Sequence, residues 1–367
     1  MNVIEAPHEG VTLLRTVAGA VIDLDQIEDP GLFRLPYPPE VQRALDRTVL
    51  ACLLRGAEPP LSVPELLAWC RERPVVDWPL DLPADLAHPD DLLIDPEAWV
   101  PTDLCYEWAV DAPDAAVEQI DRALIHSALD SCRSAGRPAS YVAFRRLLIE
   151  HPVLSEAKLS EIALHPELTP VDGLLERVYL PAPDGLQRNS SFAACSCCEL
   201  LLVPTNDGLW WCENPRCRVA GTIRPGTTYP VDEGGGVRLL TRPLRLFVTM
   251  PGRAELALAA DLAVMEPELW PNYDAYDLRI TMPDGQVWAV DVKDWANPAL
   301  LGRNTRSLDS DPPYDRAFVV VPDHRLKARR SYVRIARRSL RATPDLEIWG
   351  HRAFVREAKA VWKGTHA

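Results

Sequence analysis

The segment VWAVDVKDW, residues 287–295, places charged side chains within an apolar run. Because a β-strand alternates its faces with a period of two residues, Asp291 and Lys293 share one face with Val287 and Ala289. A carboxylate and an ammonium group on so apolar a strand are costly unless they are paired or bound to a ligand. The segment therefore predicts a buried strand that carries either a structural ion pair or part of a catalytic site.

A second strand and a turn precede this segment. The strand is YDLRITM (276–282), and Pro-Asp-Gly follows it at 283–285. Pro presets the first position of a three-residue hairpin loop, and Gly accepts the left-handed conformation at its end. This loop length places Asp277 opposite Asp291, with ~4.5–5.5 Å between their Cβ atoms. A two-residue turn would shift the register by one and separate the two carboxylates.

Two carboxylates this close repel each other unless a cation lies between them. Mg²⁺ fits such a site because it binds oxygen ligands and keeps several waters, and we expect that Mn²⁺ can substitute. Asp277 and Asp291 are therefore the predicted Mg²⁺ ligands. Lys293, on the same face, would orient or help to deprotonate a metal-bound water, or neutralise charge on a phosphate.

A third acid lies in PGRAELALAADLAV, residues 251–264, which has helical apolar spacing. Glu255 shares a stripe with Leu258 and Leu262, so it is either a buried member of the site or exposed at the edge of the stripe. Glu266 and Glu268 are the alternatives if Glu255 is exposed.

Five of the nine cysteines lie between residues 195 and 217. Cys195 and Cys198 form a C-x2-C pair, and Cys212 and Cys217 form a C-x4-C pair thirteen residues later. Such pairs can surround one tetrahedral Zn²⁺, and the intervening LLLVP, TNDG and LWW have the strand, turn and strand character of a zinc ribbon. We predict a closed, structural zinc site, in which Cys197 could replace Cys195 or Cys198. The alternative is a group of unrelated thiols or a redox pair.

The basic segment RLKARRSYVRIARRSLR (325–341) contains eight Lys or Arg and no acid. We predict one helix whose outer side contacts nucleic-acid phosphates, while its apolar residues face the sheet. The alternative is a solvated helix face. The candidate phosphate-binding residues are Arg329, Arg330, Arg334, Arg337 and Arg338.

Charge is divided unevenly along this acidic chain, whose net charge is −14 over 367 residues. Residues 1–194 hold 32 acids and 15 bases, a balance of −17, and residues 195–367 hold 21 acids and 24 bases, a balance of +3. The split indicates that the carboxy-terminal part faces an anion. The first part is expected to be mainly helical, with a short strand pair at 11–24. Between Arg73 and Arg122 this part has 13 acidic residues and no Lys or Arg. This acidic stretch is a solvated surface, a docking surface for a basic partner, or a segment that shields the catalytic face when no nucleic acid is bound.

With Asp277, Asp291-Val292-Lys293 and the helical Glu255 in this order, residues 245–355 resemble the PD-(D/E)XK nuclease superfamily, which includes restriction endonucleases. No Pro precedes Asp277, as in many members of the superfamily. The resemblance implies that Asp277 and Asp291 bind Mg²⁺, that Glu255 supports the metal, and that Lys293 assists the attacking water. The whole chain is similar, by its architecture, to the endonuclease-like proteins encoded beside prokaryotic PIWI-RE proteins in anti-phage loci.

We therefore predict an α/β multi-domain protein. It comprises a helical acidic domain (1–180), a zinc ribbon (195–222) and a restriction-endonuclease-like mixed sheet flanked by helices (240–367). In the last of these, a strand is expected at 345–354 after the basic helix. The expected activity is Mg²⁺-dependent endonucleolytic cleavage of DNA in bacterial defence, with RNA not excluded as substrate. The alternative is a non-cleaving scaffold that binds nucleic acid or a helicase. Expected partners are DNA, a helicase and a PIWI-like protein of the same locus, with a homodimer possible. No signal peptide or membrane helix is evident, so a cytoplasmic location is expected.

Overall fold

The computed structural model describes residues 9–27, 35–83, 85–109, 116–219, 221, 223–231, 236–340 and 346–364, with the backbone alone of 116–123 and 219. The chain folds as two compact units, each made of several segments. The first comprises Met1–Ile120, Trp295–Thr305 and Ser331–Ala342; the second comprises Asp121–Asp294, Arg306–Arg330 and Thr343–Ala367. The described helices and strands give the α/β multi-domain fold that the sequence predicts. No helix within these described ranges is long and apolar enough to cross a membrane.

Helices build the first unit. They are α1 (Glu9–Asp25), α2 (Pro39–Leu54), α3 (Val63–Glu72), a 3₁₀ turn (Val75–Asp77), α4 (Asp103–Ala109), α13 (Pro298–Asn304) and α15 (Tyr332–Ser339). Helices α13 and α15 approach so closely that a Cβ on Gly302 would lie 2.2 Å from the carbonyl oxygen of Ala336.

The predicted strand pair at 11–24 is wrong, because this segment forms α1. Its buried residues Leu14, Val17, Ala18 and Val21 recur at i, i+3, i+4 and i+7, which is a helical stripe rather than an alternating strand.

The second unit begins with helices around a small antiparallel sheet. The helices are α5 (Ala116–Ser134), α6 (Pro138–Glu150), α7 (Glu156–Ala163), a 3₁₀ segment (Pro166–Val171) and α8 (Asp172–Val178). The sheet has the order β1 (Val153–Ser155), β7 (Val237–Leu240) and β2 (Tyr179–Pro181). Strand β7 follows the cysteine cluster in the chain, but it pairs with β1 and β2, which precede the cluster. The small sheet therefore joins segments on either side of the cysteine cluster. The predicted boundaries at 1–180, 195–222 and 240–367 therefore stay a proposal.

The cysteine-containing segment consists of two short hairpin-like pairs. Strand β3 (Ser191–Cys195) pairs with β6 (Pro225–Pro230), and β4 (Val203–Pro204) pairs with β5 (Trp210–Trp211). A 3₁₀ turn (Asp184–Leu186) precedes β3, and α9 (Pro215–Val219) follows β5. The antiparallel pairing of β4 and β5 confirms the hairpin predicted between the two cysteine pairs.

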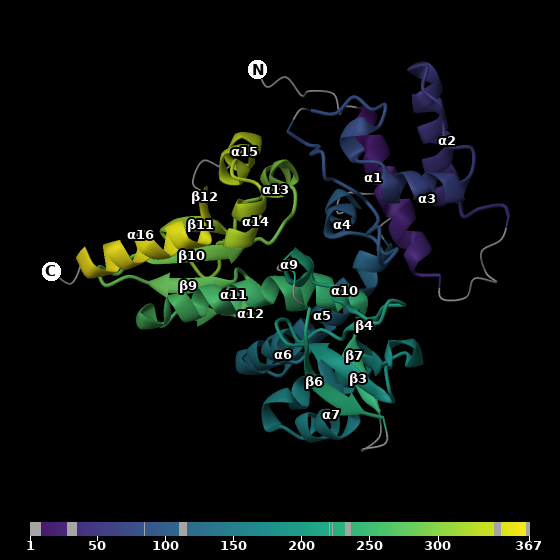
Figure 1. Cartoon of the computed structure of the whole chain (residues 1–367). Coiled ribbons are helices and arrows are strands. Elements are labelled where there is room, and N and C mark those ends of the chain that lie inside the picture. The colour runs from purple at the N-terminus through teal and green to yellow at the C-terminus, as the bar shows by residue number, and fades with distance from the viewer. Residues whose placement is uncertain are drawn as a thin grey trace. The chain divides into compact units, whose positions relative to one another are not determined.

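A five-stranded mixed sheet forms the main layer of the second unit (Figure 1). Its order is β12 (Leu346–Gly350), β11 (Arg316–Val321), β10 (Val287–Val292), β9 (Leu278–Thr281) and β8 (Glu268–Leu269). The pairs β12–β11 and β11–β10 are parallel, and β10–β9 and β9–β8 are antiparallel. Between β7 and β12 lie α10 (Arg242–Leu244), a π-helical turn (Arg245–Thr249), α11 (Met250–Asp261), a 3₁₀ turn (Ala263–Met265), α12 (Pro271–Asp274) and α14 (Asp323–Ala328).

The hairpin of β9 and β10 has the predicted register. Trp288 pairs with Ile280 and Val290 with Leu278. Gly285 takes a left-handed conformation at φ 88°, as the three-residue loop requires. One further step along the ladder places Asp291 opposite Asp277.

One face of the strands forms a single apolar core. Trp288, Val290 and Val292 pack there with residues of β11, α11 and the last helix, α16 (His351–Gly364). Their burial fixes which face of β10 carries Asp291.

Two predicted elements at the carboxy-terminal end differ from the structure. The strand expected at 345–354 ends at Gly350, where α16 begins, because Phe354 and Ala358 repeat at a helical spacing of four and are fully buried. The single basic helix expected at 325–341 is two helices, α14 and α15, since the backbone is extended at Arg329. Of the predicted phosphate-binding residues, Arg329 and Arg330 therefore lie between the two helices, and Arg334, Arg337 and Arg338 lie on α15.

Candidate active site

The β9–β10 hairpin brings the two predicted carboxylates into a buried environment. Asp277 is 6% exposed, and the Asp291 side chain is 14% exposed. The Val292 backbone N–H donates a hydrogen bond to Oδ2 of Asp277 at 2.6 Å, across the hairpin. Burial and repulsion from Glu255 and Asp291 raise the pKa of Asp277 well above its ordinary value. The hairpin thus holds an acid whose charge is disfavoured unless a cation is nearby.

Glu255 is a buried member of this group, at 2% exposure, and not an exposed residue at the edge of α11. Both of its carboxylate oxygens lie 3.0 Å from Nη2 of Arg145 on α6. The indole N–H of Trp270 donates to Oε2 of Glu255 at 2.6 Å. The buried carboxylate therefore has donors on more than one side, which fixes its orientation.

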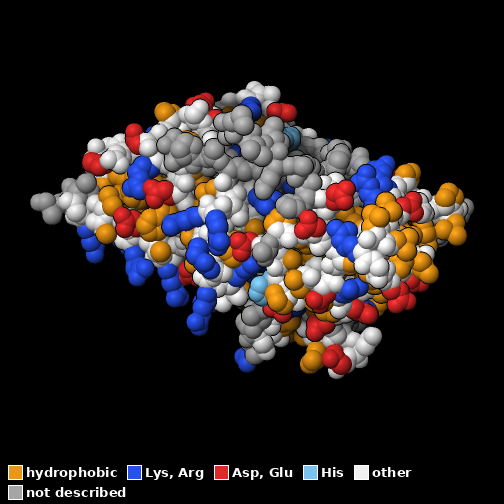
Figure 2. Space-filling view, turned by 90° about the horizontal axis from the view of Figure 1, so that it is seen from above, with side chains coloured by type: hydrophobic (Ala, Val, Ile, Leu, Met, Phe, Trp, Pro, Cys, Tyr) orange, Lys and Arg blue, Asp and Glu red, His pale blue; other side chains and the backbone are white. Residues whose placement is uncertain are grey.

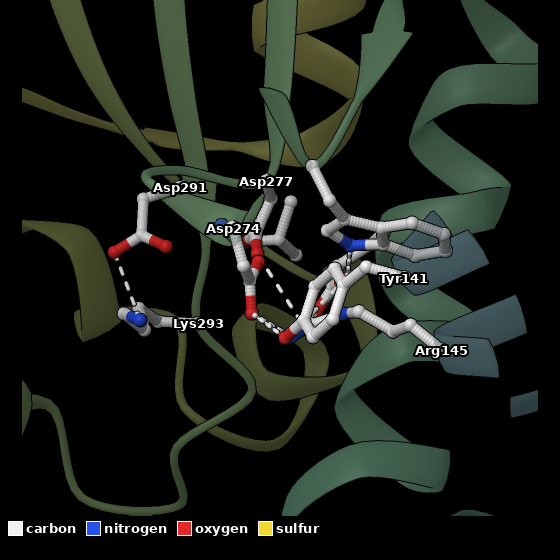
Figure 3. A network of polar contacts seen from close by, with 9 residues as sticks. Tyr141, Arg145, Asp274, Asp277, Asp291 and Lys293 are labelled. Carbon is white, nitrogen blue, oxygen red and sulfur yellow. Dashed lines mark hydrogen bonds and ion pairs between the residues drawn. The ribbon is translucent and has the colours of Figure 1, made fainter. Parts of the chain in front are cut away.

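Arg145 connects three of the acids (Figure 3). Besides Glu255, its guanidinium forms an ion pair with Asp274 and lies 3.6 Å, Nη2 to Oδ1, from Asp277. Although burial opposes the charge, the carboxylates of Glu255, Asp274 and Asp277 raise the pKa of Arg145 well above its ordinary value. Arg145 is therefore charged, and it holds the acids of α11 and the hairpin together.

Asp274 and Tyr141 complete this side of the group. The Tyr141 hydroxyl lies 3.2 Å from Oδ2 of Asp274. Burial first, and then repulsion from Glu255, raise the pKa of Asp274 to about 6 against the opposing effect of Arg145. The backbone around Asp274 is unusual, because Trp270, Asn272, Tyr273 and Asp274 all have positive φ values between 46° and 76°. Left-handed non-glycine residues of this kind cost free energy and are held by surrounding contacts.

Sequence reasoning missed Arg145, Asp274, Tyr141 and Trp270. Arg145 lies on an ordinary amphipathic helix, and its partners are more than a hundred residues away in the chain. The one available signal was that Asp274 lies only three residues before Asp277, a predicted ligand.

Lys293 pairs with Asp291 on the other side of the group. Its Nζ lies 2.8 Å from Oδ2 of Asp291, and its side chain is 40% exposed. Burial opposes the charge, but Asp291 and Asp277 raise the pKa of Lys293 above its ordinary value. Lys293 is thus a protonated group at the more exposed end of the site. Figure 3 shows it beside Asp291 and apart from Arg145 and Tyr141.

The charges of this acid cluster fit one divalent cation. Four carboxylates face two cations, so the cluster carries a net charge of −2 when all are ionised. Arg145 lies among the acids, and the carboxylate oxygens of the predicted ligands point to different donors, Val292 and Lys293. Carboxylate oxygens are the ligands that hard divalent cations such as Mg²⁺ and Mn²⁺ take, but among the described residues no three of these acids converge on one point. The cluster comprises Glu255, Asp274, Asp277, Asp291, Arg145 and Lys293.

The cysteine cluster is a separate site, able to hold a metal ion. Its four sulfur atoms lie within 4.8 Å of one another and all four residues are buried: Cys195, Cys198, Cys212 and Cys217. Sγ of Cys198 is 3.4 Å from Sγ of Cys212, which suits thiolates around a single ion. Cys197 is exposed, so the alternative in which it replaces Cys195 or Cys198 is not supported. Within the described ranges, this is the one group of three or more metal-ligating side chains that converge on a point.

Buried ion pairs join the cysteine cluster to α10 and the π-helical turn, which precede α11. Glu213, next to Cys212, accepts hydrogen bonds at 2.7 Å from the Nε atoms of Arg242 and Arg245. Although burial opposes ionisation, the two arginines lower the pKa of Glu213. The cysteine cluster therefore braces the chain that enters α11.

The predicted basic residues occupy different surroundings. Arg330, Arg334, Arg337 and Arg338 are exposed, and Arg329 is partly buried. The apolar side of this segment is predicted as Val333, Ala336 and Leu340. Of these, Ala336 is buried, together with Tyr332 and Ile335, whereas Val333 and Leu340 are partly exposed. Since α15 belongs to the first unit and the acid cluster to the second, the two features are described separately.

Two regions of the chain match known families. Residues 252–366 match the family described as "REase associating with pPIWI_RE", and residues 13–155 match "pPIWI_RE three-gene island domain Y". The comparisons with curated proteins and with solved structures find no match. The matches confirm the predicted resemblance to a restriction-endonuclease-like partner of pPIWI_RE defence proteins. The first match spans the acid cluster on α11 and the hairpin, and the second reaches α6 with Arg145.

Proposed function

We propose that this protein is a divalent-metal-dependent endonuclease that hydrolyses DNA phosphodiester bonds as part of a bacterial defence system. The observation that carries the proposal is the register of the hairpin, whose last pair, Val290 with Leu278, brings the neighbouring Asp291 and Asp277 to the same end of the ladder, within the region that matches a restriction-endonuclease-associated family. Glu255 and Lys293 flank this pair. The order of these residues along the chain and their common location support the same chemistry.

The acids would hold Mg²⁺, or Mn²⁺ in its place, through the carboxylates of Asp277 and Asp291, with support from Glu255. When bound, the metal supplies charge for the leaving 3′-oxygen and lowers the pKa of water. Lys293 is 40% exposed and protonated, so its ammonium group can approach a phosphate oxygen and neutralise the charge that grows in the transition state. Asp291 holds Lys293 in position through the 2.8 Å contact.

The four cysteines would hold Zn²⁺ as a structural ion, because four thiolates leave no open position for a substrate. The domains would be 1–180, 195–222 and 240–367, in a cytoplasmic protein. We further propose a PIWI-like protein and a helicase of the same locus as partners, and a homodimer as an arrangement for cutting two strands. Support for the PIWI-like partner comes from the names of the two matched families. Arg329, Arg330, Arg334, Arg337 and Arg338 would contribute phosphate contacts.

The test is cleavage of DNA by Lys293→Ala in the presence of Mg²⁺ or Mn²⁺. We expect the cleavage rate to fall by ~10²–10³, the range for loss of one group that stabilises charge in the transition state. Lys327→Ala is the matched control, because Lys327 is an exposed lysine of α14 in the same unit. Cleavage by Lys293→Ala at the wild-type rate would contradict the proposal. Substituting RNA in the same assay tests RNA as substrate.

A second candidate function is a scaffold that binds nucleic acid or a helicase without cutting. The observation that favours it is Arg145, which pairs with Glu255 and Asp274 and so satisfies these acids without a metal. Wild-type protein that binds DNA and is inert on single- and double-stranded DNA and RNA, with either metal and with its partners present, would support this function.

A further inference from the structure

The last helix of the chain carries a second basic surface, which sequence reasoning did not identify. Four basic residues of α16 are exposed, and they recur at i, i+4, i+7 and i+11: Arg352, Arg356, Lys359 and Lys363. At ~100° per residue, this spacing confines all four to an arc of about 60°. We call this row the α16 stripe. Figure 2 shows Lys and Arg side chains projecting in a row at the lower left of the surface, where α16 lies.

The opposite side of α16 is fixed in the core, so the stripe faces solvent. Phe354 and Ala358 are fully buried, and Val361 and Trp362 pack against the same core cluster. The acid of this helix, Glu357, lies ~100° or more around the helix axis from Arg352 and Arg356. The stripe is therefore a continuous positive row on a chain with a net charge of −14.

Solvent, not internal ion pairs, surrounds most of the stripe. Arg352 Nε lies 2.9 Å from Asp323 Oδ2, but the Arg352 side chain remains 78% exposed. Within the described residues, Arg356, Lys359 and Lys363 have no ion pair. An internal structural role does not account for four aligned cations of this kind, whereas an external polyanion does.

The stripe begins at the edge of the sheet that carries the acid cluster. Strands β10, β11 and β12 are parallel, so their carboxyl ends meet at one edge. Lys293 follows β10 at this edge, and its backbone N–H donates a hydrogen bond to the carbonyl oxygen of Val320 on β11. Helix α16 begins directly after Gly350, the last residue of β12. Since neighbouring strands lie ~4.8 Å apart, the first turn of α16 starts about 10 Å along this edge from β10.

We infer that the phosphate backbone of a nucleic acid lies along the α16 stripe and reaches the sheet at the edge where Lys293 follows β10, with α16 on the Trp288 face of the sheet and Asp291 on the other. From its first to its fourth basic residue, the stripe rises about 16 Å along the helix axis. One strand of a duplex presents a phosphate every ~3.4 Å along its own axis. Four cations thus meet a similar number of phosphates. This inference rests on the proposed function only for the fate of the bound strand, because binding along α16 does not require cleavage.

The test measures how the affinity for nucleic acid depends on salt, in EDTA so that nothing is cut. One variant replaces all four stripe residues with Ala. Each lost phosphate contact lowers the slope of log K against log[salt] by ~0.9, so we expect a slope smaller by about 3.6 than that of the wild type. A control variant replaces four exposed basic residues of other helices with Ala: Arg43, Arg47, Lys158 and Arg177. It should keep the wild-type slope.

Two further arms sharpen the result. Lys359→Arg with Lys363→Arg keeps the charge and should keep the slope, which separates phosphate contact from misfolding. Duplex DNA and duplex RNA are both used as probes, because they share the phosphate chemistry. A smaller slope with either probe supports the inference and identifies that nucleic acid, DNA or RNA, as a ligand of the stripe. An unchanged slope on both probes, or an equal decrease in the control, overturns it. If Lys293→Ala loses cleavage but keeps the wild-type slope, binding along the stripe is independent of catalysis, as the inference requires. If the wild-type protein binds with the expected slope but cuts nothing, the proposed cleavage fails and the inference holds.

Discussion

Nη2 of Arg145 lies 3.0 Å from both carboxylate oxygens of Glu255. Helix α6 thus supplies the counter-ion of an acid that lies 110 residues later in the chain. Glu255 is 2% exposed, which means that water cannot replace this cation. Removing one partner of a buried ion pair leaves an uncompensated charge and costs about 3–5 kcal/mol. The contact therefore couples the stability of the fold to the acid cluster.

We expect Arg145→Ala to lower the free energy of unfolding by about 3 kcal/mol in EDTA, measured by urea denaturation. Arg146→Ala is the matched control on the same helix. Arg146 is 46% exposed and pairs with Glu150 at 3.2 Å, so its loss should cost less than about 0.5 kcal/mol. Equal losses in the two variants would contradict a special role for Arg145. Since Arg145→Ala leaves the cluster with one more uncompensated negative charge, added Mg²⁺ should stabilise this variant more than the wild type.

The prediction for Asp277 separates stability from activity. Asp277→Asn removes a buried negative charge that Glu255 and Asp291 repel, while the amide oxygen can still accept the Val292 N–H. We therefore expect a higher melting temperature in EDTA together with loss of Mg²⁺-dependent cleavage. Asp284→Asn in the loop of the same hairpin is the control, because Asp284 is exposed and accepts the Gln286 N–H. It should leave both quantities unchanged, and a Asp277→Asn protein that cleaves normally would exclude Asp277 as a metal ligand.

Local features of the sequence predicted the hairpin because its register depends on the loop of three residues and on alternation. Those two constraints act within twenty residues, and the pairing of Val290 with Leu278 follows from them. The cysteine cluster was predictable for a similar reason, since ligand spacing fixes which sulfurs can meet. Glu255 was predictable as a candidate, but its burial depended on packing that no stripe pattern decides.

Arg145 and Asp274 could not be predicted because their contact joins α6 to the segment before the hairpin, 129 residues away. The break between α14 and α15 and the start of α16 were missed for a different reason. The charges at 325–341 were uniform enough to suggest one helix, and the apolar residues after Gly350 fit a strand and a helix equally over a short window. The buried positions Phe354 and Ala358 then decide for the helix.

The two neighbouring cysteines Cys197 and Cys198 give a direct test of the proposed zinc site. Cys198→Ser removes one of four converging thiolates, so we expect the zinc content measured by mass spectrometry to fall from one ion per chain to near zero. The melting temperature should fall as well, because metal binding contributes to folding free energy. Cys197→Ser should retain the metal, since Cys197 is exposed. Loss of zinc in both variants, or in neither, would contradict the assignment of ligands.

Asp294 gives a prediction for acid conditions. Its carboxylate is 2.6 Å from Nε of Arg325 and 2.9 Å from Nε2 of His324, and its side chain is 9% exposed. Burial opposes ionisation, but Arg325 and His324 lower the pKa of Asp294 from 3.8 to about 2. Because the folded-state pKa lies below the unfolded-state value, the carboxylate stabilises the fold above pH 4, and this stability is lost as the pH falls toward 2.

We therefore expect Asp294→Asn to lower the free energy of unfolding by roughly 2 kcal/mol at pH 7, measured by urea denaturation. The difference between variant and wild type should shrink as the pH is lowered from about 4 to about 2, where both lack the charge. Asp90→Asn is the control, because Asp90 is 91% exposed and its loss should cost less than about 0.5 kcal/mol at any pH. A difference for Asp294→Asn that stays constant from pH 7 to pH 2 would show that Arg325 and His324 stabilise the fold by packing rather than by charge.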